Sequence, residues 1–148
     1  MKIARIVSVV ILVLTDLLVG VWAGFLPQSF YNDFPGNGRV WVAVDGPFNE
    51  HLTRDVGTLY LGLAAIGIVA LLARSKILTG AFGLGSLVFG LPHLVYHLRH
   101  TDLLDTSDNV LNLTGLGLAV VAAVLAMTAV LDGPEPDHAD DDHPARRA

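Results

Sequence analysis

The hydrophobic positions of the chain fall into four long apolar blocks separated by short polar segments. The blocks cover about residues 6–26, 56–73, 77–98 and 110–131. A helix needs about 20 mainly apolar residues to cross the hydrocarbon core of a bilayer. The pattern therefore predicts an all-α fold, a four-helix transmembrane bundle in residues 1–131. With their polar ends included, the expected helices cover about residues 6–26, 47–73, 77–98 and 108–131.

Composition agrees with a membrane protein. Of the 148 residues, 53% are hydrophobic and 16% are charged, whereas about a quarter of the residues in a soluble domain are charged. Cysteine is absent, which excludes disulfides, thiolate metal ligands and cysteine nucleophiles. The sequence has no nucleotide-binding glycine pattern and no basic surface for nucleic acid. The lipid bilayer is therefore the first expected partner.

The first apolar block has a second interpretation, as a cleavable signal peptide. Lys2 and Arg5 form a basic start, and residues 21–23 (VWA) resemble a cleavage site. The length of the apolar run, its tryptophan and the charge of Asp16 in its middle favour a retained membrane helix. Whether residues 1–23 are retained stays open at this point.

Lysines and arginines predict the orientation. Lys2, Arg5, Arg74 and Lys76 fall on the side of both termini and of the middle loop. Cytoplasmic loops are enriched in these residue types. We expect a multi-pass protein of the plasma (inner) membrane, N-in and C-in. The Pro-rich, acidic residues 132–148 cannot bury enough apolar surface to fold, so they are expected to form a disordered cytoplasmic tail.

Polar residues of three helices are expected at one depth. Counted at about 1.5 Å per residue from the cytoplasmic helix ends, Asp55, His93, His97 and Asn112 lie roughly 25–31 Å deep. In a core about 30 Å thick, they would lie just beneath the outer surface. The expected supporting residues near this layer are Glu50, Arg54 and His100.

Small residues continue the polar faces of these helices. On the second helix, the arc that holds His51 and Asp55 continues as Gly62 and Ala65. The polar residues of the third and fourth helices share faces with small residues in the same way. Because small residues let membrane helices approach closely, we expect all three polar faces to point toward one another.

Asp16 lies deeper, about 16 Å from the cytoplasmic end of the first helix. A charged group is costly at this depth, so Asp16 should face the bundle. It is either a neutral carboxyl bonded to a neighbouring helix or the inner end of a polar path.

The first outer loop contains several local signals. PGNG at residues 35–38 is typical of a turn, and RVWVAV predicts a short extended segment. Residues 45–47 (DGP) are typical of a helix start. The loop is a candidate lid over the polar layer or a simple interfacial anchor, because it is rich in aromatic residues. These are Phe30, Tyr31, Phe34, Trp41 and Phe48.

The spacing of the histidines raises the hypothesis of a metal site. His93 and His97 are at i and i+4, where two imidazoles can hold one metal ion, and His51 and Asp55 repeat this spacing. These four residues are candidate ligands of zinc, iron or copper. A haem would need His51 to face His93 or His97 across the bundle.

Other interpretations of the polar cluster remain open. Arg54 is at i+4 from Glu50 and beside Asp55, so it can neutralise either carboxylate without a metal. The histidines can also form interhelical hydrogen bonds that only hold the bundle together, or they can bind a small ligand. No serine or lysine lies in a nucleophile arrangement, and whether the chain is an enzyme stays open.

The loop sequence SFYNDFPGNGRVWVAVDGPFNEHLTRDVG, followed by PHLVYHLRH, resembles an uncharacterised family of short bacterial four-helix integral membrane proteins. The resemblance covers about residues 1–131. These proteins are sometimes placed near the DoxX-like group, whose members have been linked to membrane oxidoreductase complexes. The resemblance implies an accessory redox role and carries over no catalytic residues.

Three hypotheses of function follow. The first is a metal or small-ligand site with a redox or accessory role. The second is a non-catalytic subunit or scaffold of a membrane complex, in which the polar cluster is structural. The third is a small proton-linked transporter in which Asp16 titrates. Since four short helices enclose little volume, a homodimer or a partner in a membrane complex is a further expectation.

Overall fold

The computed structural model describes residues 2–131. Four of its helices are long and apolar enough to cross a membrane, which confirms the four long helices expected from the sequence. The expected tail, residues 132–148, lies outside the described residues. In chain order, the elements are α1 (Ile3–Phe25), α2 (Pro27–Asp33), β1 (Pro35–Gly36), β2 (Arg39–Val40), α3 (Glu50–Ala73), α4 (Lys76–Arg99), α5 (Thr106–Met127) and the 3-10 helix η1 (Thr128–Leu131).

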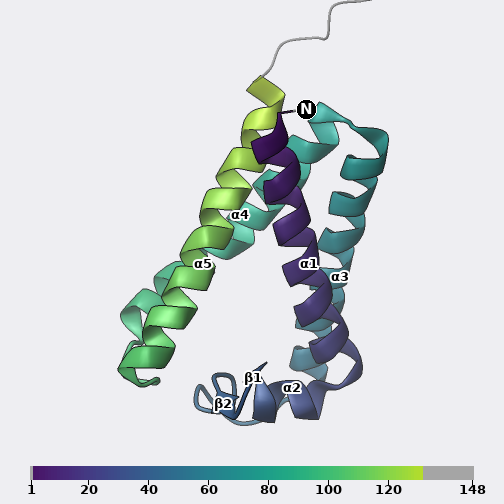
Figure 1. The fold of residues 1–148 in the computed structure, drawn as a ribbon. Coiled ribbons are helices and arrows are strands. Elements are labelled where there is room, and N and C mark those ends of the chain that lie inside the picture. The colour runs from purple at the N-terminus through teal and green to yellow at the C-terminus, as the bar shows by residue number, and fades with distance from the viewer. Residues whose placement is uncertain (1, 132–148) are drawn as a thin grey trace, which may run out of the picture.

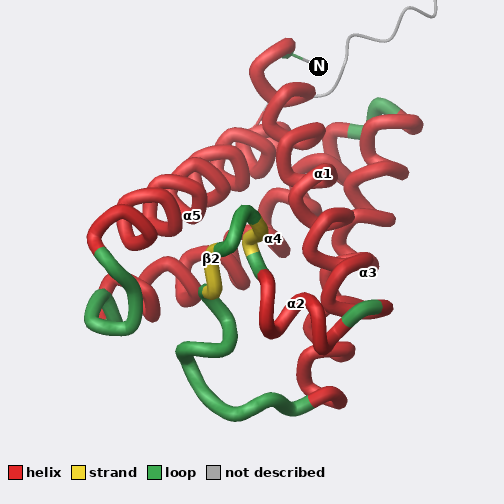
Figure 2. Tube along the Cα trace, turned by 60° about the horizontal axis from the view of Figure 1, so that its bottom comes forward, coloured by secondary structure: helices red, strands yellow, loops and turns green. Residues whose placement is uncertain are grey.

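The four long helices form two antiparallel pairs, α1 with α3 and α4 with α5 (Figure 1). The pairs meet at the end of the bundle where α1 begins, and they diverge toward the end where α2 and the β1–β2 hairpin lie. Figure 2 shows the hairpin between the two pairs. The start of α1 lies beside the end of α5, because the Arg5 guanidinium donates a 3.0 Å hydrogen bond to the Thr128 carbonyl oxygen.

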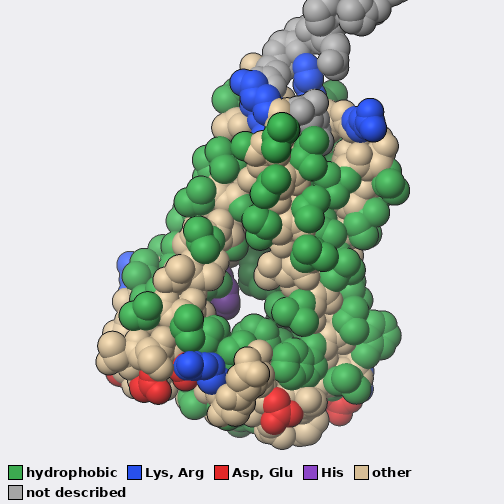
Figure 3. Space-filling model, viewed as in Figure 1, with side chains coloured by type: hydrophobic (Ala, Val, Ile, Leu, Met, Phe, Trp, Pro, Cys, Tyr) green, Lys and Arg blue, Asp and Glu red, His purple; other side chains and the backbone are tan. Residues whose placement is uncertain are grey.

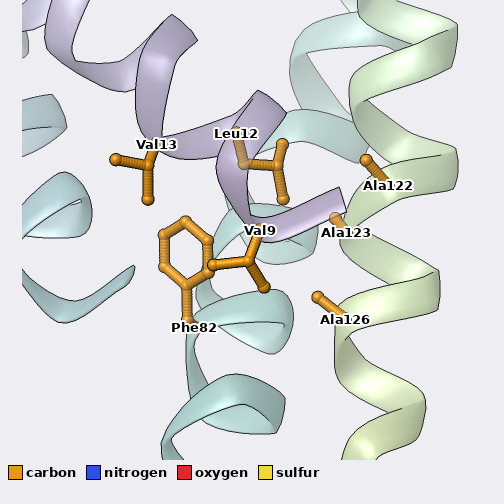
Figure 4. Close-up of a cluster of buried hydrophobic side chains, with 7 residues drawn as sticks. All are labelled: Val9, Leu12, Val13, Phe82, Ala122, Ala123 and Ala126. Atoms are coloured by element: carbon orange, nitrogen blue, oxygen red, sulfur yellow. The ribbon is translucent and has the colours of Figure 1, made fainter. Parts of the chain in front are cut away.

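The main apolar cluster lies where the two pairs meet (Figure 4). Val9 and Leu12 of α1 and Phe82 of α4 are at most 4% exposed. They face alanines of α5, whose small side chains bring the backbone of that helix close to the larger groups. This contact joins the pairs at one end. The buried residues of the cluster are Val9, Leu12, Val13, Phe82, Ala122, Ala123 and Ala126.

Glycines set the close approach within each pair. A Cβ added at Gly57 of α3 would lie against the backbone of Gly24 in α1. A Cβ at Gly83 of α4 would likewise lie against the backbone of α5 near Ala123. In lipid there is no hydrophobic drive between helices, so close packing of this kind is a main source of their association.

The buried face of α3 is not the one expected from the sequence. The expectation that the polar arc of α3 points into the bundle is wrong, because Gly62 and Ala65 of that arc are exposed. Two stripes of small residues run along α3 on different sides. The stripe that contains Gly57 allows the closest approach to α1, so it forms the interface. The buried residues of α3 are Gly57, Ala64, Gly67 and Ala70.

The segment between α1 and α3 contains a helix that the sequence pattern did not predict, α2. The expected turn at residues 35–38 is present between β1 and β2. Gly36, Asn37 and Gly38 have φ angles of 98°, 57° and 76° there. Glycine and asparagine tolerate this left-handed region best, which explains the sequence of the turn.

One other expectation for this segment is met only in part, and one is wrong. The extended segment predicted from RVWVAV is a strand only at Arg39–Val40. The helix α3 begins at Glu50 and not at residue 47. The start is set by Asn49, whose side-chain oxygen accepts a 3.1 Å hydrogen bond from the Leu52 amide and so caps the helix.

The surface has the character of a membrane protein. In Figure 3, hydrophobic side chains cover the middle of the molecule, and charged side chains lie near its two ends. Large apolar residues such as Leu14, Leu59 and Leu118 are more than half exposed. An apolar surface of this extent is typical of a membrane contact.

We predict that Gly57→Ala destabilises the bundle. The new Cβ would meet the Gly24 backbone and separate α1 from α3, at a cost of about 1–3 kcal/mol. Thermal unfolding in mild detergent, followed by circular dichroism, measures the loss. The control is Gly62→Ala on the same helix, where nothing lies within 4 Å of an added Cβ. Equal unfolding temperatures of the two variants would contradict the close contact of α1 and α3.

Candidate functional site

The molecule is hollowed where the helix pairs diverge. In Figure 3 an opening lies between the pairs, and a histidine side chain is visible inside it. Gly115 of α5 lies two turns from each of the buried residues Asp108 and Ala122, on the same face of the helix. Gly115 is nevertheless exposed, and a Cβ there would meet nothing within 4 Å. The inner face of α5 thus borders open space at this level.

The loop at residues 34–49, called the lid below, spans the open end of the hollow. Arg39 forms an ion pair with Asp108 of α5, and its guanidinium lies 3.4 Å from the Ser107 hydroxyl. The Tyr96 hydroxyl of α4 donates a 2.6 Å hydrogen bond to the Asp45 carboxylate. Since the lid is covalently joined to α3 and, through α2, to α1, these contacts connect the two helix pairs.

Aromatic rings hold the other side of the lid against α1. The ring centroid of Trp22 lies 6.0 Å from that of Phe30 and 5.9 Å from that of Phe34, and Phe34 lies 6.0 Å from Trp41. All three are edge-on contacts, which contribute about 0.5–1.5 kcal/mol each beyond their buried area. The lid is therefore fixed to one pair by packing and to the other by polar contacts.

His97 of α4 and Asn112 of α5 form a polar contact beside the hollow. The Asn112 Nδ2 atom lies 3.0 Å from the His97 Nδ1 atom. An amide nitrogen can only donate, so Nδ1 accepts, and the proton of the neutral imidazole is on Nε2. Among the residues that the structure describes, none forms a hydrogen bond with Nε2. His97 therefore presents a free N–H donor.

A row of rings runs from His97 along α4 to α3. The ring centroids of His97 and His93 are 4.8 Å apart, and His93 stacks on Phe89 at 5.2 Å. Phe89 in turn makes an edge-on contact at 5.2 Å with Tyr60 of α3. The i, i+4 spacing places the three α4 rings on one face of the helix. These four residues are called the ring row below.

The candidate residues at the start of α3 lie outside the ring row. His51 Nε2 is 3.3 Å from a carboxylate oxygen of Asp55, and the two side chains are 89% and 54% exposed. The guanidinium Nε of Arg54 is 2.9 Å from the Glu50 carboxylate, and Arg54 also donates to the Gly24 carbonyl oxygen at 2.7 Å. Arg54 thus neutralises Glu50, as one interpretation of the sequence expected.

The four candidate metal ligands are therefore not gathered at one point. His93 lies with His97 in the ring row, whereas His51 pairs with Asp55 on the exposed side of α3. Within residues 2–131, no group of three or more His, Asp or Glu side chains is placed to hold a metal ion. Because the buried face of α3 is not the expected one, His51 also does not face His93 or His97 as a haem between helices would require.

His100 belongs to the end of α4. Its Nδ1 atom lies 2.8 Å from the Tyr96 carbonyl oxygen, and its ring stacks on that of Tyr96 at 4.1 Å. Tyr96 is the residue that binds Asp45 of the lid. His100 thus supports a lid contact and does not enter the ring row.

Asp16 is buried on α1, as expected, with 6% of its surface exposed. It lies one turn beyond Leu12 of the apolar cluster, in the direction in which the pairs diverge. Its Oδ2 atom has no hydrogen-bond partner among the described residues, and its carboxyl interacts electrostatically with Tyr60. Asp16 therefore lies near the end of the ring row at Tyr60.

Several residues of the site were not singled out in the sequence. Phe89 had a signal, since it is four residues before His93 on the histidine face. The lid contacts had no signal in the sequence, because 51 residues separate Asp45 from Tyr96 and a larger interval separates Arg39 from Asp108. Pairing at such distances follows from the tertiary fold alone.

Comparison of the chain with protein-family models, curated proteins and solved structures gave no match. The fold itself defines a class, a helical bundle with four helices that can span a membrane. The resemblance to short bacterial four-helix proteins and to the DoxX-like group stays a prediction.

We predict that Arg39→Ala detaches the lid from α5. The Asp108 side chain is 13% exposed, so the loss of its partner costs about 1–3 kcal/mol. Hydrogen–deuterium exchange of the lid amides should accelerate. The reversed pair Arg39→Asp, Asp108→Arg should restore slow exchange. Unchanged exchange in Arg39→Ala would show that the ion pair does not hold the lid.

We also predict that Asp16→Leu stabilises the protein. The substitution removes a buried oxygen without a hydrogen-bond partner, and such an atom costs about 1–3 kcal/mol. Thermal unfolding in detergent measures the gain. Asp16→Asn is the control, because it keeps polar atoms at the same place and should bring no gain. A loss of stability in Asp16→Leu would mean that the carboxyl has a stabilising partner.

Proposed function

We propose that this chain is an integral membrane protein that binds a small, uncharged molecule in the hollow between its two helix pairs. The observation that carries the proposal is the His97–Asn112 contact. It fixes the proton of His97 on Nε2 and presents this donor beside open space, under a lid that is closed by polar contacts.

The hydrogen-bonding state of the ring row favours a ligand over a purely structural network. A structural network in a membrane uses its donors and acceptors within the protein, because unpaired polar groups are costly there. His97 uses one ring nitrogen in this way, and His93 contacts its neighbours through ring packing. The remaining nitrogens are available to a bound molecule.

The charges around the hollow favour an uncharged ligand. The Arg39 guanidinium and the Asp108 carboxylate neutralise each other, and Asp45 accepts a hydrogen bond from Tyr96. What remains for a ligand is the Nε2–H donor of His97, the ring nitrogens of His93 and the faces of aromatic rings. This set suits a molecule with an oxygen acceptor and an apolar body.

The location belongs to the same proposal. We place the protein in the plasma (inner) membrane with both termini in the cytoplasm. The support is that Lys2, Arg5, Arg74 and Lys76 lie at one end of the bundle, as the positive-inside rule requires of a cytoplasmic end. The lid then lies at the outer surface. An accessory role in a membrane redox system, which the resemblance implies, completes the proposal.

We predict that Gly115→Leu removes the ligand. Nothing lies within 4 Å of a Cβ added at Gly115, so we expect the leucine side chain to extend into the hollow, to occupy the space of the ligand and to leave the fold intact. Native mass spectrometry of protein extracted from its own membranes in mild detergent measures the bound mass. The wild type should carry it, and Gly115→Leu and His97→Ala should each lose it.

The matched control is Gly117→Leu. This glycine is two residues away on α5, it points to a different side of the helix, and an added Cβ there also meets nothing within 4 Å. Its ligand content should equal that of the wild type. If the wild type carried no small molecule, or if all variants retained it equally, the ring row would be structural and the scaffold hypothesis would replace this proposal.

A further inference from the structure

An apolar groove lies on α3 next to the ring row. It has a volume of about 450 Å³ and is bounded by one face of α3 and by Phe89 of α4. Its lining includes Val56, Leu59, Leu63 and Ile66 and contains no charged side chain. Ligand sites usually measure about 300–1,000 Å³, so the groove is large enough for part of a small molecule.

The groove and the ring row share two residues. Tyr60 and Phe89 line the groove, and both are members of the ring row. Phe89 stacks directly on His93, whose ring contacts His97. A molecule that lies in the groove and continues along these rings therefore reaches the Nε2–H donor of His97.

We propose that the ligand is an amphiphile of the bilayer, with a long hydrocarbon chain in this groove and an uncharged carbonyl group that accepts a hydrogen bond from His97. The inference rests on the proposed function, and it adds the chemical class of the ligand and the place of its chain.

The position of the groove argues for a hydrocarbon chain. The groove lies on a helix that can span a membrane, so its surroundings are acyl chains. From Val56 to Ile66 it follows about 15 Å of helix rise, which is half the thickness of a hydrocarbon core. An elongated apolar chain fits these dimensions, and it enters sideways from the bilayer without crossing the lid.

The charges argue against a phospholipid as the occupant. A phosphate head needs arginine or lysine donors. Arg39 forms an ion pair with Asp108, and Arg54 forms one with Glu50. Arg99 is exposed and, two residues after His97, lies on a different side of α4. A neutral carbonyl, in contrast, needs one N–H donor, and His97 supplies one.

The test uses hexadecan-2-one with a diazirine near the end of its chain, added to the full-length protein in phosphatidylcholine nanodiscs. After illumination, mass spectrometry of tryptic peptides locates the label. We expect it mainly on the α3 peptide that follows Arg54. Excess unlabelled hexadecan-2-one should suppress this labelling.

Gly62→Leu is the decisive variant. Gly62 lines the groove, and nothing lies within 4 Å of an added Cβ, so we expect leucine to extend into the groove and to leave the helix contacts in place. Labelling of the α3 peptide should fall about tenfold, which corresponds to a misfit of about 1.4 kcal/mol. Gly117→Leu on α5 is the control and should label as the wild type does.

The outcomes separate the two proposals. Equal labelling of all lipid-facing helices, or labelling that Gly62→Leu leaves unchanged, overturns the groove inference. If Gly115→Leu still removes the native ligand in that case, the proposed function stands with a ligand of another class. If neither variant has an effect, both proposals fail.

Discussion

The structure depends on where small side chains allow helices to touch. In lipid, apolar side chains gain little from meeting each other instead of acyl chains, so association follows close backbone approach. Gly57 against Gly24 closes the α1–α3 pair near the lid, and Gly83 against α5 closes the other pair at the opposite end. Between the pairs, Val9 and Leu12 of α1 meet Phe82 of α4 and the alanines of α5 near the start of α1. Away from this contact the pairs diverge, and the hollow follows from that divergence.

The lid is the consequence of this asymmetry. The two helix pairs are joined by apolar packing at one end. At the opposite end, where charged side chains gather, the polar contacts of the lid form the second connection. The contacts of the lid fall next to those of the site. Tyr96, which binds Asp45, is adjacent to His97, and Asp108, which binds Arg39, is one turn from Asn112. The lid contacts therefore lie directly beside the two residues that present the donor.

The sequence predicts those features that depend on local pattern. Hydropathy gives the four long helices, and the i, i+4 spacing puts His93 and His97 on one face. The burial of Asp16 follows from the cost of a carboxylate in lipid. The rotation of α3 could not be predicted, because that helix carries small residues on two sides, at Gly57 and at Gly62. Which side packs is decided by the shape of α1, and only the tertiary structure contains that information.

The same rotation decides between the hypotheses of a metal and of a ligand. His51 and Asp55 are about 120° and about 160° around α3 from Gly57. Bringing them to the ring row would therefore remove Gly57 from Gly24 and place larger side chains in the tightest contact of the pair. It would also break the hydrogen bond from Arg54 to the Gly24 carbonyl oxygen. The packing of α1 on α3 thus leaves the two histidines of α4 with aromatic and amide neighbours, and the Asp45 carboxylate, which interacts electrostatically with both histidines, accepts a hydrogen bond from Tyr96. Those neighbours suit an uncharged molecule better than a cation.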